Sequence, residues 1–487
     1  MTENRKTGVA AADELLAGMS SASLYAKSDF FSCGVKGCAL ASVDLTDAEG
    51  LRELLRAIKN AKEETLDYAA LENRVLVNFE HKYLTDGEEA QAGLLAGDAL
   101  VFLDGQDGCV LVNVRKYELR SISEPPTAGV IKGPREGFIE NLKSNLSMLE
   151  RKLRTPDLEI ERLKVGRRTT TDVAIVSIRG IADRNVVDEV KRRLERIDID
   201  GVLDSHYLQM YIEPRPYSVF NQVGTCEKPD IAAAKLLEGR VAVLCDGTPI
   251  ALTVPFISFE DMQSSEDYYE RSTFASLLRV TRVIALFLGV FLPGFYVALE
   301  VYHFSALPLQ LLLTIMNATK GVPFPPLAEI LFVMLLFEII REAGVRMPQA
   351  MGLAMSVVGA LVLGDTAVKA GMIGSPAVMI VALSSIATYT VPDSAGSSSL
   401  LRIVFTIIGG LLGMYGLLVC GMFLLLYLAG MNGYGAPYLA PYAPDIGRDK
   451  QDGLLKTPVV DIARRPRSIP TENDTRQNTV HDRRGNG

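Results

Sequence analysis

The pattern of apolar positions changes its character near residue 270. Before that point, apolar residues recur at helical spacing or form short runs of strand length, and after it they form long stretches. Helical spacing covers 49–62, 136–153 and 184–197, and short apolar runs cover 99–103, 173–178 and 241–245. This alternation of helices and strands predicts an α/β soluble region.

The second part of the chain is nearly free of charge over lengths that suit a membrane. Uncharged runs cover 283–299, 301–319, 347–364, 370–392 and 403–444. Because about 20 apolar residues cross the hydrocarbon core of a bilayer, this pattern predicts an integral membrane protein. We expect a bundle of about five transmembrane helices, near 283–302, 325–341, 349–368, 373–391 and 401–429.

The number of spans has alternatives that stay open at this point. Five spans would place the two ends of the chain on opposite sides, yet the nine Lys+Arg of residues 431–487 favour the cytosolic side. Either 303–319, interrupted by Pro308, is an additional span, or the long run after Arg402 bends near Gly409 and Gly410.

Charge separates the chain into three parts. Residues 1–270 hold 33 Lys+Arg and 45 Asp+Glu, residues 271–430 hold 8 and 6, and residues 431–487 hold 9 and 7, which agrees with the net charge of -8 over 487 residues. The acidic balance argues against a nucleic-acid partner. The polar tail at 431–487 is predicted to be disordered.

The start of the chain and the start of the first span predict an orientation. Residues 1–18 contain no continuous apolar stretch of the kind found in signal peptides. Arg271, Arg279 and Arg282 stand at the start of the first expected span, where positive charge favours the cytosol. We therefore expect the soluble region to lie on the cytosolic side.

An internal repeat divides the soluble region. The stretch LLAGDALVFLDG at 94–105 matches LLEGRVAVLCDG at 236–247 at six of twelve positions. Each copy is expected to form a helix end, a glycine cap, a buried strand and an Asp-Gly turn. Convergence of unrelated helix–strand–turn units would also give this similarity, but the shared register favours two related α/β subdomains. We expect the following parts: a polar segment at 1–29, subdomains at 30–130 and 135–260, a transmembrane domain at 272–430, and the tail.

Dense motifs from Pro134 onward resemble one known family. They are PREGF at 134–138, IDGVLDS at 199–205, EKPD at 227–230, LEGR at 237–240, DGTP at 246–249, EDYY at 266–269, VPFP at 322–325, REAG at 341–344, VGALVLG at 358–364 and YGAPY at 434–438. The series is similar to the GerA family of spore germination proteins, the A-type subunits of nutrient germinant receptors. The soluble-domain positions that carry it are Glu227, Pro229, Asp230, Glu238, Gly239, Arg240, Asp246 and Gly247.

The resemblance implies a complex in the spore inner membrane with a transporter-like B subunit and a lipoprotein C subunit. It also implies that the B subunit is the main germinant-binding component, and that A subunits form homo-oligomers, as pentamers, around a cation-conducting pore. Lys228 and Asp365 depart from the family pattern, in which an arginine and an amide are usual.

The helix expected at 349–368 is the candidate for lining a pore. Val358, Val362, Asp365 and Lys369 recur every three or four residues and so share one face. Several copies of that face around an axis would form apolar rings followed by a ring of carboxylates, which favours cations. The alternative is that the apolar stripe only packs, with Asp365 and Lys369 as an i,i+4 pair at the membrane edge.

A second charged group precedes that helix. Glu338, Arg341, Glu342 and Arg346 lie on neighbouring turns of an otherwise apolar stretch. Because ionisable side chains at membrane depth are costly, they usually face a partner or an aqueous path. We interpret the group as a charge-paired elbow that couples the soluble region to the pore; the alternative is a solvated turn at the interface.

The sequence contains none of the common catalytic or metal-binding patterns. It has no GxSxG, P-loop, GxGxxG or HExxH motif, and its six cysteines form no CxxC. We expect a receptor subunit that triggers germination as a ligand-gated cation channel, with no enzyme activity, metal or cofactor. Two alternatives are a secondary transporter or permease, and a germination amplifier of the same family that needs no germinant.

Overall fold

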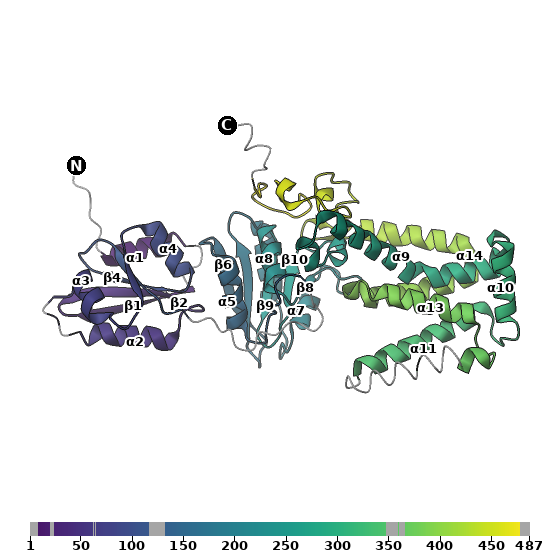
Figure 1. Ribbon diagram of the computed structural model, residues 1–487, viewed down its shortest axis with the longest axis horizontal. Helices are drawn as coiled ribbons and strands as arrows, with labels where there is room; N and C mark the ends of the chain where they lie inside the picture. The colour runs from purple at the N-terminus through teal and green to yellow at the C-terminus, as the bar shows by residue number, and fades with distance from the viewer. Residues whose placement is uncertain are drawn as a thin grey trace.

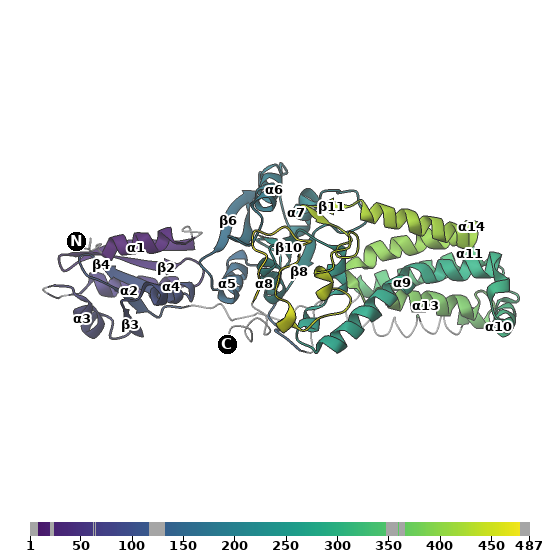
Figure 2. The ribbon, with the colours of Figure 1, turned by 90° about the horizontal axis from the view of Figure 1, so that it is seen from above.

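The computed structural model describes residues 8–19, 24–61, 63, 65–115, 132–346, 359 and 366–477. Figure 1 and Figure 2 show the parts of the chain in a row: a first α/β unit, a second α/β unit and a region of helices. The C-terminal segment does not continue beyond the helices. In both views it lies back over the second unit.

The first unit is a five-stranded antiparallel sheet with helices on both faces. Its strand order is β1-β2-β4-β5-β3. One buried cluster lies between the sheet and α1 and α4, and another lies between the sheet and α2. The elements are α1 (Gly8–Ala17), β1 (Tyr25–Ser32), β2 (Val35–Ser42), α2 (Ala48–Lys59), α3 (Tyr68–Ala70), η2 (Leu71–Val75), β3 (His81–Leu84), α4 (Gly87–Leu95), β4 (Ala99–Leu103) and β5 (Cys109–Val112).

The second unit has the same plan. Its strand order, β6-β7-β9-β10-β8, becomes that of the first unit when the strands are counted from its own start. Helices α5 and α8 cover one face, and α6 and α7 cover the other. The elements are α5 (Leu142–Lys152), β6 (Leu158–Val165), β7 (Thr171–Ile178), α6 (Arg184–Glu195), α7 (Ser205–Ile212), β8 (Gly224–Cys226), α8 (Pro229–Leu237), β9 (Val241–Cys245) and β10 (Ala251–Val254).

The sequence repeat occupies the same place in the two units. Its first copy runs from the end of α4 through β4, and its second copy runs from the end of α8 through β9. The capping glycines Gly97 and Gly239 have φ of 96° and 105°, a region that side chains with a Cβ rarely adopt. The Asp-Gly turns follow β4 and β9, as the pattern predicts.

The helical region begins after two short turns of helix. Among the described residues, two segments are long and apolar enough to cross a membrane, Ser272–Tyr302 and Pro392–Ala429. The expected spans at 325–341 and 373–391 fall on α11 and α13, and that at 349–368 lies largely outside the described residues. The elements are η3 (Ser258–Met262), η4 (Ser265–Tyr268), α9 (Ser272–Tyr302), η5 (Phe304–Ala306), α10 (Leu309–Thr319), α11 (Pro326–Arg346), α13 (Ser375–Thr388), η7 (Pro392–Ser394) and α14 (Ala395–Ala429).

Helix α14 reverses direction at Gly413. The backbone there is not helical, with φ 63° and ψ -153°, and it lies against the far end of α9 at Tyr302. Both ends of α14 lie near the second α/β unit instead, because Asn221 donates to the carbonyl of Asp393 at 3.0 Å and Arg215 donates to that of Gly430 at 3.0 Å. The long apolar run therefore bends, as one of the two open alternatives has it, at Gly413, three residues beyond Gly410.

The C-terminal segment is ordered from residue 431 to residue 477, so the prediction of a disordered tail is wrong there. Its backbone forms β11 (Asn432–Gly433), β12 (Ala436–Pro437), η8 (Asp449–Gln451) and η9 (Val459–Asp461). Arg465 donates to the carbonyl of Leu237 at 2.6 Å, and Thr471 donates to that of Ile181 at 2.6 Å. The prediction rested on polar composition, but polar side chains such as Arg465 and Thr471 form hydrogen bonds with the second unit rather than with water.

Candidate functional site

A cavity of about 360 Å³ lies where the second α/β unit meets the helical region and the C-terminal segment. Helix α8 forms one wall, the turns η3 and η4 form another, and Asp393 of η7 also lines the cavity. Its polar and charged lining comprises Asn221, Thr225, Asp230, Lys235, Glu238, Arg240, Glu260, Asp261, Gln263, Ser264, Ser265, Tyr268, Tyr269, Asp393 and Arg476.

A buried arginine organises one wall of this cavity. Arg240, 3% exposed, donates to Glu260 at 2.9 Å and is also paired with Glu238. Lys235 reaches the other oxygen of Glu260 at 2.7 Å. Burial alone would lower the pKa of Arg240, but the two carboxylates outweigh it and raise that pKa, so the guanidinium stays charged. Burial likewise opposes ionisation of Glu260, yet its two cationic neighbours hold its pKa below the usual value.

The predicted soluble-domain residues divide between this cavity and the frame of the unit. Asp230, Glu238 and Arg240 line the cavity. The others have structural places: Glu227 accepts the backbone N–H of Phe138, Pro229 begins α8, Gly239 lies against Thr471, Asp246 accepts the N–H of Leu142, and Gly247 donates to the carbonyl of Glu140.

A second buried ion cluster fixes the start of α9 and was not expected from the sequence. Asp267, fully buried, accepts from Arg279 at 3.1 Å and from Arg282 at 2.7 Å. Arg279 also donates to Asp452 of the C-terminal segment at 2.9 Å. Two arginines three residues apart on an apolar helix were the signal for a buried carboxylate, but its position could not be read from spacing.

The four elbow residues form two separate ion pairs. Glu338 contacts Arg341 at 2.6 Å and reaches Arg402 on α14 at 2.7 Å. Arg402 is 2% exposed and also donates to Ser385 on α13 at 3.0 Å, so Glu338 joins three helices. The pair Glu342–Arg346, at 2.6 Å, lies exposed near the end of α11.

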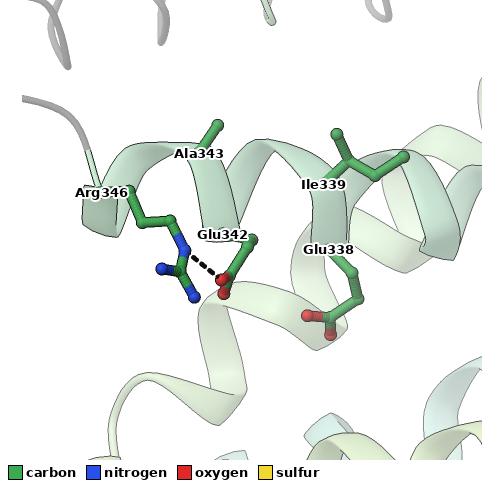
Figure 3. A pocket seen from close by; sticks show the side chains of 5 residues that line it. All are labelled: Glu338, Ile339, Glu342, Ala343 and Arg346. Carbon is green, nitrogen blue, oxygen red and sulfur yellow. Dashed lines mark hydrogen bonds and ion pairs between the residues drawn. The ribbon is translucent and has the colours of Figure 1, made fainter.

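Figure 3 shows how the side chains of α11 are distributed at this point. Glu338, Glu342 and Arg346 lie toward one side of the helix, and Ile339 and Ala343 lie toward the other. The dashed line marks the pair between Glu342 and Arg346. The elbow therefore has an inner half, which is bonded to neighbouring helices, and an outer half at the helix end.

Most of the pore candidates fall outside the described part of the chain. The residues outside it are Val358, Val362 and Asp365. The fourth candidate, Lys369, is described, and its side chain is exposed. Within the described part of the chain, no group of three His, Cys, Asp or Glu side chains is suited to hold a metal ion.

Comparisons with known proteins agree on one family. The model of the Bacillus/Clostridium GerA spore germination protein family matches residues 25–468. The chain is 41% identical over 386 residues to spore germination protein KA of Bacillus subtilis (strain 168), which covers 79% of this chain and 71% of that protein. It is 31% identical over 439 residues to spore germination protein A1 of the same strain, which covers 90% of each.

One solved structure is also similar. It is the crystal structure of the N-terminal domain of the A subunit of the Bacillus megaterium spore germinant receptor GerK3, at 28% identity. The match covers 50% of this chain and 91% of that chain, with a TM-score of 0.38.

Proposed function

The chain belongs to the GerA family of spore germination proteins, and from this premise we propose that it is a membrane subunit of a spore nutrient-germinant receptor. The resemblance carried by the motifs is thereby confirmed. The named relatives are spore germination proteins, and the similar crystal structure is that of a receptor A subunit. The proposed role requires partners, namely the transporter-like B subunit and the lipoprotein C subunit that the resemblance implies.

One connected set of contacts carries this proposal. Asn221 of the second unit donates to the carbonyl of Asp393 in η7, two residues before α14. Arg402, on the same helix, is bonded to Glu338 of α11. A displacement of the second unit would therefore be passed through α14 to α11, which leads toward residues 349–368. We propose that Glu338 and Arg341 form the working part of this elbow, with Glu342 and Arg346 at its outer end.

The proposed output is a cation flux through an oligomer of this chain. Val358, Val362, Asp365 and Lys369 would line the pore, with valines forming apolar constrictions and Asp365 favouring cations. The two α/β units and the C-terminal segment would lie together on the cytosolic side of the spore inner membrane. The contacts of residues 431–477 with the second unit support placing these parts on one side of the membrane, which requires an even number of crossings.

Ion flux from vesicles that contain the purified full-length chain tests the proposal. Truncating a constriction weakens dewetting, so Val362→Ala should raise passive cation flux several-fold, and Asp365→Asn should reduce the preference for cations over anions. Val404→Ala, on an exposed part of α14, is the matched control and should leave both unchanged. Folded oligomers that conduct nothing, alone or with B and C subunits present, would contradict the channel.

A further inference from the structure

We propose that the cavity between α8, η3 and η7 binds an organic cation, held by its primary ammonium group between the carboxylates of Asp261 and Asp393. The inference concerns a ligand site within this chain and does not depend on whether the chain conducts ions. It rests on the charge, the pairing and the lining of the cavity.

More negative than positive side chains line the cavity. Three cationic side chains, Lys235, Arg240 and Arg476, face five carboxylates. The carboxylates are those of Asp230, Glu238, Glu260, Asp261 and Asp393. Asp261 is half-buried and Asp393 is exposed, and an excess of two carboxylates gives the cavity a negative potential that favours a cationic ligand.

The pairing shows which carboxylates are in excess. Glu260 is satisfied by Arg240 and Lys235, and Glu238 is satisfied by Arg240. The carboxylates of Asp261 and Asp393 have no hydrogen bond or ion pair among the residues that the structure describes. A third acceptor also lines the cavity, because Asp230 uses one oxygen for the hydroxyl of Tyr269 and its other oxygen is buried without a partner.

The two unpaired carboxylates repel one another across the cavity. Burial, and then the negative charge of Asp393, raise the pKa of Asp261 to about 7. Glu260, on the same turn, adds to the repulsion, and Lys235 on α8 opposes it only in part because its ammonium is bonded to Glu260 and Thr253. An ammonium group placed between the two carboxylates would remove this repulsion.

The remaining lining fits an organic ligand better than a bare ion. Val223, Ile231, Ala234, Phe256 and Val459 supply apolar surface, and two tyrosines supply aromatic rings. The volume of about 360 Å³ falls in the range of small-molecule sites. The described residues also lack a three-ligand group for a metal. A small aliphatic or aromatic amine satisfies all of these features.

Such a ligand would connect two parts of the molecule that otherwise repel each other. Asp261 belongs to η3, on the approach to α9, and Asp393 belongs to η7, which leads into α14. Binding at this position therefore ties the soluble unit to the turn between α13 and α14.

Calorimetric titration of the full-length protein in nanodiscs tests the site, with 1,4-diaminobutane and butylamine as probes and butyrate as the anionic control. At pH 8 both amines should bind saturably, the diamine more tightly, and butyrate should not bind. Asp261→Asn and Asp393→Asn should each weaken binding about tenfold or more, because each removes one of the two carboxylates that hold the ammonium group. Asp445→Asn, at an exposed position outside the cavity, should bind as the wild type does.

The dependence on pH and on the fold completes the test. The amines stay protonated, whereas Asp261 must give up its proton to bind them, so affinity at pH 5.5 should be more than tenfold lower than at pH 8. Thermal unfolding reports whether the asparagine variants are folded, and the wild type should unfold at a higher temperature with diamine present. Absence of saturable amine binding to folded wild type, or equal binding by the folded variants, would overturn the proposal.

Discussion

The two α/β units share a strand order but are completed by different parts of the chain. In the first unit, Arg115, three residues after the end of β5, forms a β-bridge with Thr46, just before α2. In the second unit, the equivalent bridge to Ala182, just before α6, is made by Thr471, far away in the sequence. The first unit closes with its own residues, and the second needs the C-terminal segment.

The ion pairs at the repeat follow the same division. In the first copy Asp98, buried, is paired at 2.5 Å with Arg115 of its own unit. The second copy has Arg240 at that position, and it is paired with Glu260, on the approach to α9. A reversal of charge at one repeat position thus turns an internal contact into a connection between the soluble unit and the helices.

Among the tests of this comparison, Arg240→Met is expected to have the largest effect on the free energy of unfolding. Removing the guanidinium takes away the short ion pair of Glu238 and leaves Glu260 with only Lys235 as a cationic partner. Loss of one partner of a buried ion pair costs about 3–5 kcal/mol of folding stability. Chemical denaturation in detergent should show that loss in the free energy of unfolding. The double variant Arg240→Met/Glu260→Gln should recover part of it; no recovery would mean that the arginine acts through packing alone.

At the interface between the two units we predict a smaller effect on stability, which depends on pH. Glu150 of α5 is buried against the first unit near Asp44, and burial, then that charge, raise its pKa to about 8. The folded state therefore keeps a proton that the unfolded state releases, so stability should fall as pH rises from about 4.5 to about 8 and then level off.

Glu150→Gln removes this titration. At pH 8 it should raise the free energy of unfolding by on the order of 3 kcal/mol and flatten the curve between those pH values. Unfolding followed across pH 4–9 measures both. An unchanged slope in the glutamine variant would show that another group at the interface sets the dependence, such as Asp44, whose pKa burial also raises.

A matched pair of glycine substitutions gives the smallest but sharpest effect. Gly97→Ala and Gly239→Ala each force a side chain into a positive-φ backbone, at about 1–2 kcal/mol. The new methyl group meets Leu45 of the same unit at 2.9 Å in the first case and Thr471 at 3.1 Å in the second. Only Gly239→Ala should therefore speed tryptic cleavage after Arg464 and Arg467; equal cleavage in both variants would contradict the comparison.

Local patterns predicted much of the soluble fold and part of the site. The spacing around Gly97 and Gly239 identified the repeat, because a helix end, a cap and a buried strand are all contained in twelve residues. The same motif placed Glu238 and Arg240 together, and both line the cavity. Such features depend on neighbours in the chain, so they can be read before the fold is known.

Features that depend on distant partners could not be predicted in this way. Asp261 and Asp393 are 132 positions apart, and only the approach of η7 to η3 makes them neighbours. A bend near Gly409 and Gly410 was only one of two open alternatives, and the sequence could not single out Gly413 because several glycines share that apolar run. The C-terminal segment has the composition of a disordered tail, and its order comes from carbonyl groups such as those of Leu237 and Ile181.

The bridge from Thr471 to Ala182 also sets an order of events during synthesis. The second α/β unit is made early, but the residue that closes it leaves the ribosome only after every helix between them. Until then the edge beside Gly239 stays uncovered. If an odd number of helices were inserted into the bilayer, Thr471 would end on the opposite side and the unit would never close. The second unit can therefore complete its fold only when the helices have been inserted with the correct topology.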